Sequence, residues 1–174
     1  IPAGMEMMDK ALIHATDNFV KAGYPRDAES MLIVELDGTE KEVEELIKKV
    51  SKIAKKNKSS SIKISKNEKQ RLKFWAGRKA AFPACGDMAP DYYCMDGTIP
   101  RGKLAEVLKE IGRLSKKYNL PVANAFHAGD GNLHPLIMYD ANEKNSLEKT
   151  EKFGADILKY CVKVGGVLTG EHGV

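Results

Sequence analysis

The chain has 174 residues, and its 28 lysines and arginines against 24 aspartates and glutamates give a formal net charge of +4. This length is enough for one domain with a substantial core, and the intermixing of charges, with no basic stripe between aromatic residues, excludes a nucleic-acid-binding protein. No apolar run approaches the ~20 residues of a transmembrane helix, and the cysteines form no CxxC pair, which favours reduced thiols in a cytoplasmic protein.

The first part of the chain predicts a helix and then a strand-helix-strand unit. Residues 5–22 are predicted to be helical, because apolar residues recur there at intervals of three and four. The apolar run 31–38 ends in Asp-Gly and predicts a strand, which a helical pattern follows at residues 40–56. Residues 59–65 alternate in polarity, so they are predicted to form the strand that completes the unit 31–65.

A similar order of predicted elements follows in the middle of the chain. A helix is predicted over residues 67–82, ending before Pro83 because a residue that precedes proline disfavours helical geometry. The patterns then predict a strand over 91–99, a helix over 100–118 and a strand over 122–127. This middle part therefore repeats the order strand, helix, strand.

The last part predicts a β-hairpin and a helix. The glycine-rich turn 128–132 contains Asp-Gly and Gly-Asn, which tolerate positive φ, and it leads into a strand over 133–139. An amphipathic helix is predicted over 145–164, ended by Gly165 and Gly166. The elements together predict an α+β fold.

The predicted architecture is an antiparallel sheet covered by helices. Its two strand-helix-strand units, residues 31–65 and 91–128, suggest ferredoxin-like halves. No low-complexity linker divides the chain, so residues 1–174 are interpreted as one domain.

Two histidines in the segment HAGDGNLH could share one ligand. The hairpin turn returns the chain beside itself, so His127 and His134 can point to the same place from opposite arms. Imidazole suits zinc, manganese and iron, and a carboxylate as third ligand, for which Glu171 is the candidate, would leave positions open for a substrate. The alternative is that the two histidines only cap strand ends and hydrogen-bond the turn.

A second histidine motif and one arginine could carry chemistry. His172 stands between Glu171 and Gly173, and its ordinary pKa near physiological pH suits removal of a proton from a hydroxyl group; the alternative is a loop histidine without a partner. Arg78, in the predicted helix, could clamp a carboxylate through two parallel hydrogen bonds. An ordinary surface salt bridge is the alternative for Arg78.

Four ordered segments resemble a known family. These segments are KFWAGRKAAFPA, PDYYCMDGTIPR, NAFHAGDGNLHPL and GEHGV. They resemble the carboxy-terminal domain of the FAD-linked oxidases, a family that includes glycolate oxidase and D-lactate dehydrogenase, over essentially residues 3–174. The resemblance implies oxidation of a small 2-hydroxy acid, glycolate or D-lactate, to the 2-oxo acid, with hydride passing to FAD.

The resemblance also implies residue roles. His127, His134 and Glu171 would hold a divalent metal, zinc or manganese, and His172 would be the general base. Arg78 would neutralise the substrate carboxylate. Three further residues are expected to contact the substrate: Tyr93, Asn132 and Asp130.

Two departures from the family pattern bear on the substrate. Relatives that act on dicarboxylates have a lysine in the strand where this chain has Tyr92, Tyr93 and Cys94, and a threonine at the position of Phe82. A small monocarboxylate, glycolate or lactate, is therefore favoured over 2-hydroxyglutarate.

The resemblance implies parts that these residues do not supply. The family's FAD-binding domain precedes this region, and no glycine-rich phosphate-binding segment is found here, so we expect a fragment that is inactive in isolation. Electrons would leave to an acceptor subunit, an iron-sulfur protein or an electron-transfer flavoprotein, and such subunits could place the enzyme at a membrane surface. A homodimer is also considered. The alternative function is a non-catalytic metal-binding or partner-docking module.

Overall fold

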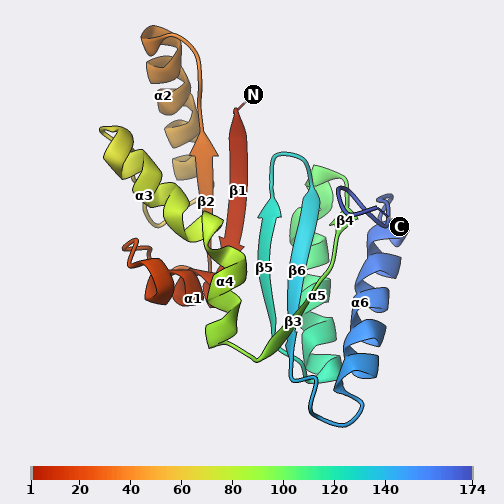
Figure 1. Cartoon of the computed structure of the whole chain (residues 1–174). Helices are drawn as coiled ribbons and strands as arrows, with labels where there is room; N and C mark the ends of the chain where they lie inside the picture. Colours follow the sequence, from red (N-terminus) through yellow and green to blue (C-terminus); the bar gives the residue numbers. More distant parts are fainter. Residues whose placement is uncertain (1, 174) are drawn as a thin grey trace.

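A six-stranded antiparallel sheet crosses the molecule in the order β2, β1, β5, β6 and β3, with the short β4 beside β6 (Figure 1). The computed structural model describes residues 2–173. The strands are β1 (Gly4–Asp9), β2 (Ser30–Glu35), β3 (Asp91–Cys94), β4 (Gly97–Thr98), β5 (Val122–His127) and β6 (Asn132–Tyr139).

Helices cover both faces of this sheet. They are α1 (Lys10–Val20), α2 (Glu40–Lys56), α3 (Glu68–Lys79), α4 (Ala81–Ala84), α5 (Leu104–Tyr118) and α6 (Ser146–Lys163), with short 3-10 turns at Cys85–Asp87 and Arg101–Lys103. The helices α5 and α6 pack on one face around Val107, Phe153 and Ile157, whereas α1 and α4 pack on the other around Leu12 and Ala81. Figure 1 shows α5 and α6 side by side, separated from α1 and α4 by the sheet.

The strand β6 explains why both faces are covered. Successive side chains of a strand point to opposite faces, and seven of the eight residues of β6 are buried. Leu133 and Ile137 join the core under α5 and α6, while Leu136 and Met138 join the core under α1 and α4. A strand that is buried on both sides needs a packed layer on each face of the sheet, and in this fold both layers are helical.

The structure confirms the α+β fold with an antiparallel sheet, and it confirms the helix over Glu40–Lys56. It also contains the predicted second half: β3 and β5 both pair antiparallel with β6 and are joined through α5, so they run parallel on either side of β6. The prediction of a first strand-helix-strand unit at residues 31–65 is wrong. Residues 59–65 form no strand, and Ile62 and Ile64 are exposed.

The start of the chain was also predicted wrongly. Instead of one helix over 5–22, the strand β1 comes first and α1 begins at Lys10. The spacing of the methionines fits the period of a helix as well as that of a strand. In the observed strand, Met7 and Met8 point to opposite faces of the sheet. Asp9 divides the two elements, because its side chain accepts a hydrogen bond from the backbone N–H of Leu12 and caps the helix.

Two smaller boundaries also differ from the prediction. The helix over 67–82 is broken at Ala80, and Pro83 lies inside the short α4, where the first turn needs no N–H. The predicted strand 91–99 is divided into β3 and β4. The helix predicted from Pro100 begins with a 3-10 turn before α5.

The helix α3 is docked by a close approach at Gly77. The hydroxyl of Tyr24 donates to the carbonyl oxygen of Phe74 at 2.6 Å and accepts from the backbone N–H of Gly77 at 2.9 Å. A Cβ on Gly77 would lie 2.2 Å from Cε2 of Tyr24. Only glycine therefore allows this contact.

We expect Gly77→Ala to lower the free energy of unfolding by about 1–3 kcal/mol, because the Tyr24 ring must move out of its site. Chemical denaturation measures the change. The matched control is Gly112→Ala in α5, where an added Cβ meets nothing within 4 Å and should stabilise the helix slightly. Equal stability of the Gly77→Ala variant and the original protein would contradict this account of how α3 docks.

Candidate metal centre

Three polar side chains gather at one end of the sheet, on the face that α1 and α4 cover elsewhere. Glu6 of β1 lies opposite His127 of β5, and His134 of β6 lies opposite Ala125 of β5. Cross-strand partners point to the same face, and so do residues two apart in one strand. Glu6, His127 and His134 therefore share this face, with the two imidazole centroids 5.2 Å apart and the rings nearly perpendicular.

The loop after α6 brings two more of the predicted residues to this place. Asp96 holds the loop, because its Oδ2 atom accepts hydrogen bonds from the hydroxyl of Thr169 (2.6 Å) and from the backbone N–H groups of Gly170 (2.9 Å), Glu171 (2.8 Å) and His172 (2.8 Å). The side chain of Asp96 is only 5% exposed. One buried carboxylate thus positions both Glu171 and His172.

The carboxylate of Glu171 lies between the two imidazoles. Its Oε1 atom is 3.2 Å from Nε2 of His127, and its Oε2 atom is 3.6 Å from Nε2 of His134. One ligand atom from each residue lies within 4.8 Å of the other two. The structure therefore brings together the three residues that the sequence nominated as metal ligands.

Each imidazole also has a carboxylate on its Nδ1 side. Nδ1 of His127 is 2.7 Å from Oε1 of Glu6, and Nδ1 of His134 is 3.9 Å from Oδ1 of Asp96. A neutral His127 that donates its Nδ1–H to Glu6 turns the Nε2 lone pair toward Glu171, so two acceptors face each other. A cation between them satisfies both, and a carboxylate behind each histidine is the usual environment of metal-bound imidazole. The residues fit a divalent ion.

The electrostatics favour a neutral His134 and an ionised Asp96. Burial lowers the pKa of His134, and the neighbouring His127 lowers it further. Burial alone would raise the pKa of Asp96, but the hydrogen bonds from the loop outweigh burial and lower that pKa well below its ordinary value. Neutral imidazole is the form that coordinates a metal.

Arg78, near the end of α3, reaches the same cluster through Glu6. Its Nε atom donates to Oε2 of Glu6 at 2.8 Å, and both side chains are 12% exposed. This is neither the exposed salt bridge nor the free carboxylate clamp considered from the sequence. Within residues 2–173 the Nη atoms of Arg78 have no hydrogen-bond partner, so they remain available to an anion.

The other predicted substrate contacts fall in different places. Asn132 is buried on the same face as His134, and a Cβ on Gly170 would come within 2.6 Å of its side chain. Asp130 is exposed in the hairpin turn. Tyr93 was expected to contact the substrate beside the histidines, but the structure places it elsewhere. It lies opposite Ile137 and so points to the face of α5 and α6, away from His134. The neighbouring Cys94 points toward the site instead.

Sequence reasoning missed Glu6 and Asp96. Glu6 stands among methionines in a segment interpreted as a helix, where nothing marks it as a partner of His127. Asp96 belongs to an Asp-Gly pair that was assigned to a strand. A charged residue in such a pair, next to an apolar strand, was the available signal for a buried carboxylate.

We expect Glu6→Gln to lower the affinity of this site for Mn²⁺ about 10–100-fold, the usual effect of removing an outer carboxylate behind a ligating histidine. Isothermal titration calorimetry measures the affinity. Glu29→Gln is the control, because the Glu29 side chain is 84% exposed and pairs only with Lys10. The same Mn²⁺ affinity in both variants would show that Glu6 does not orient His127.

The fold is also found in a solved oxidase. The structure of 4-ethylphenol oxidase from Gulosibacter chungangensis, in its isoeugenol complex, superposes with a TM-score of 0.62 over 96% of this chain and 39% of that one, at 10% identity. The class defined by fold and site is thus an α+β domain with a histidine and carboxylate cluster at one end of its sheet.

The chain belongs to the family of FAD linked oxidases, C-terminal domain, which matches residues 1–174. It is 53% identical to the glycolate oxidase subunit GlcD of Escherichia coli K12 over all of this chain and 35% of the relative, and 33% identical to GlcD of Bacillus subtilis over all of this chain and 37% of the relative. A probable mitochondrial D-lactate dehydrogenase of Danio rerio is 27% identical over 99% of this chain and 35% of its own length. The predicted resemblance is confirmed.

The chain spans about a third of the length of these relatives. The relatives from Escherichia coli and Bacillus subtilis are both named as a subunit of glycolate oxidase. Among the helices within residues 2–173, none is both long and apolar enough to cross a membrane.

Proposed function

We propose that this chain is the substrate-binding and metal-binding part of an FAD-dependent dehydrogenase that oxidises glycolate or D-lactate to the 2-oxo acid. The observation that carries the proposal is the Glu171 carboxylate between His127 and His134, with a further carboxylate behind each imidazole. Its relatives in glycolate oxidase and D-lactate dehydrogenase point to the same class of substrate.

The residues that would hold a divalent ion, zinc or manganese, are His127, His134 and Glu171. A bound ion there would supply Lewis acidity that favours loss of the substrate's hydroxyl proton. His172 lies beside this position: its ring is nearly parallel to that of His134, at a centroid distance of 5.5 Å, and it is exposed. We assign the removal of the hydroxyl proton to a ring nitrogen of His172.

Two side chains would bind the substrate. The free Nη atoms of Arg78 can donate to its carboxylate, while the Nε atom keeps Glu6 in place behind His127. Asn132 has a buried Oδ1 atom with no partner among the described residues, and this atom can accept a hydrogen bond. FAD, which residues outside this chain would mainly hold, would supply the acceptor for the hydride of C2. Loss of the hydroxyl proton to His172 and of this hydride would together give the 2-oxo acid.

The proposal includes partners for the electrons. An electron-acceptor subunit, an iron-sulfur protein or an electron-transfer flavoprotein, would reoxidise the flavin, in agreement with the description of one relative as a subunit. We place the assembly in the cytoplasm or at the membrane surface through such subunits. We also include a homodimer in the proposal, which the mass of the protein in solution would test.

The test uses the complete FAD-containing enzyme of which this chain is a part. Anaerobic addition of glycolate or D-lactate should bleach the flavin absorbance, whereas D-2-hydroxyglutarate should not. His172→Ala should slow the bleaching about 10²–10⁴-fold. The 174-residue chain alone should show no turnover. Failure of every small 2-hydroxy acid to reduce the flavin would refute the proposed activity.

One observation favours the second candidate, a partner-docking module without catalysis. No residue of α2 is buried, although its apolar residues, such as Leu46 and Val50, recur at helical spacing. A docking module would bind its partner through this face. Flavin reduction by a hydroxy acid would exclude docking as the only function.

A further inference from the structure

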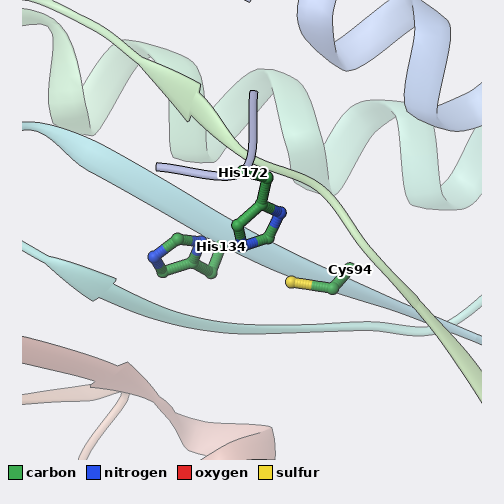
Figure 2. A group of neighbouring side chains, drawn as sticks. All are labelled: Cys94, His134 and His172. Carbon is green, nitrogen blue, oxygen red and sulfur yellow. The ribbon is translucent and has the colours of Figure 1, made fainter. Parts of the chain in front are cut away.

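Cys94 lies beside two of the histidines, outside the group formed with Glu171. It lies opposite Leu136 in the pairing of β3 with β6, so its side chain points to the same face as Leu136 and His134. His172 approaches from the loop after α6. Figure 2 shows the sulfur of Cys94 pointing toward the two imidazole rings. One ligand atom of each of these three residues lies within 4.8 Å of the other two.

We propose that Cys94, His134 and His172 form a second metal site, which takes a thiophilic divalent ion such as Zn²⁺ or Cd²⁺. A sulfur and two imidazole nitrogens are the donors that zinc-like ions prefer, whereas the group around Glu171 offers only nitrogen and oxygen. The two groups share His134 but differ in the hardness of their ligands. Metal binding at this second site is proposed independently of the oxidation of hydroxy acids.

The geometry needs only a small adjustment. A tetrahedral zinc ion separates neighbouring sulfur and nitrogen ligands by about 3.6 Å, which is about 1 Å less than the limit within which these atoms lie. Cys94 and His134 are held by paired strands, whereas His172 is exposed. We therefore expect a rotation of the His172 side chain to close the site.

Binding exchanges a proton for the metal. Burial and, to a lesser extent, the negative charge of Asp96 together raise the pKa of the Cys94 thiol to about 11. The ion forms a metal-sulfur bond as the S–H bond breaks, and the proton goes to solvent. The same negative charge that keeps the thiol protonated also attracts a cation to this place.

An ion in this site would have a consequence for the proposed reaction, and this step rests on the proposed function. The ion would coordinate the imidazole of His172, the group to which we assign removal of the substrate proton. Zn²⁺ added in excess over the ion of the first site should therefore inhibit the enzyme, and Cys94→Ala should remove the inhibition.

The test is a titration of the 174-residue chain with Cd²⁺, followed by sulfur-to-metal charge-transfer absorption in the ultraviolet. The original protein should reach full signal at one equivalent, and Cys94→Ala should abolish the signal. The matched controls are Cys85→Ala and Cys161→Ala, which remove buried cysteines that do not belong to this group and should keep the signal. His172→Ala should weaken Cd²⁺ binding on the order of 100-fold, since a direct ligand matters at least as much as an outer one.

A last variant separates the two sites. Glu171→Gln should lose Mn²⁺ binding and keep the Cd²⁺ signal, whatever the fate of the proposed activity. Circular dichroism checks that each variant is folded. The second site is overturned if the signal is absent in the original protein, survives in folded Cys94→Ala, or is unchanged in His172→Ala, which would mean that a thiol binds alone.

Discussion

The protein with Glu171 replaced by alanine is expected to bind no Mn²⁺, whereas the original protein is expected to bind about one equivalent. The carboxylate of Glu171 is the anionic group between the Nε2 atoms of His127 and His134. Without it two neutral imidazoles remain, and the ion loses both a ligand and a compensating charge. The affinity for Mn²⁺ should fall by more than about 100-fold, which is the upper range for loss of an outer ligand.

Elemental analysis and Mn²⁺ calorimetry measure this loss, and His127→Ala should reproduce it. Glu148→Ala is the control, because Glu148 is an exposed carboxylate of α6 that pairs only with Lys152. Manganese that stays bound to both the Glu171 and the His127 variant would contradict the site. A metal-free original protein that also binds no added Mn²⁺ would show that the site needs residues outside this chain.

Replacement of Asp96 by alanine should release the loop that carries Glu171 and His172. Four donors of residues 169–172 would lose their common acceptor, and hydrogen bonds to a charged group contribute roughly 1.5–3 kcal/mol each when buried. The loop is partly exposed, so water recovers part of this energy. We therefore expect Mn²⁺ affinity to fall about 100-fold, because Asp96 also stands behind His134.

Limited proteolysis distinguishes a released loop from general unfolding. Cleavage should become faster within residues 168–173 of the Asp96→Ala variant, while the helices keep their far-ultraviolet circular dichroism. In the Asp96→Asn variant the amide oxygen still accepts hydrogen bonds, so its loop should be cleaved at a rate between those of the original protein and the Asp96→Ala variant. Unchanged cleavage together with unchanged Mn²⁺ affinity would show that Asp96 does not position the loop.

The charge of Asp96 gives this contact a pH dependence. Its pKa is lower in the folded protein than the ordinary value, because the hydrogen bonds outweigh burial. The stabilisation is therefore complete above the ordinary pKa and is lost as the pH falls through the depressed folded-state pKa. At neutral pH the anchor of the loop is fully ionised.

Local patterns predicted those elements whose period is unambiguous. The helix Glu40–Lys56 has a clean helical repeat, and the hairpin of β5 and β6 has turn residues between two apolar runs, so both were found. The segment around Met5 to Met8 fits a strand and a helix equally well. Its state is decided by pairing with β2 and β5, which no local pattern contains.

The site was predictable to the extent that it is local. His127 and His134 are close in sequence on the two arms of one hairpin, so their meeting followed from the turn. Glu6 and Asp96 reach the site through pairing of distant strands and could not be placed beforehand. For Tyr93 the strand was predicted but not which face each residue occupies, and adjacent residues of a strand always point to opposite faces.

Two of the candidate metal ligands belong to the hairpin, and the third follows α6. An ion held by all three would close a ring that contains the whole of that helix, much as a disulfide does, but its strength would vary with metal supply. At a free ion concentration 100 times the dissociation constant, such a reversible cross-link stabilises the folded state by about 2.7 kcal/mol. The helix α6 would then report the availability of the ion through its own resistance to unfolding.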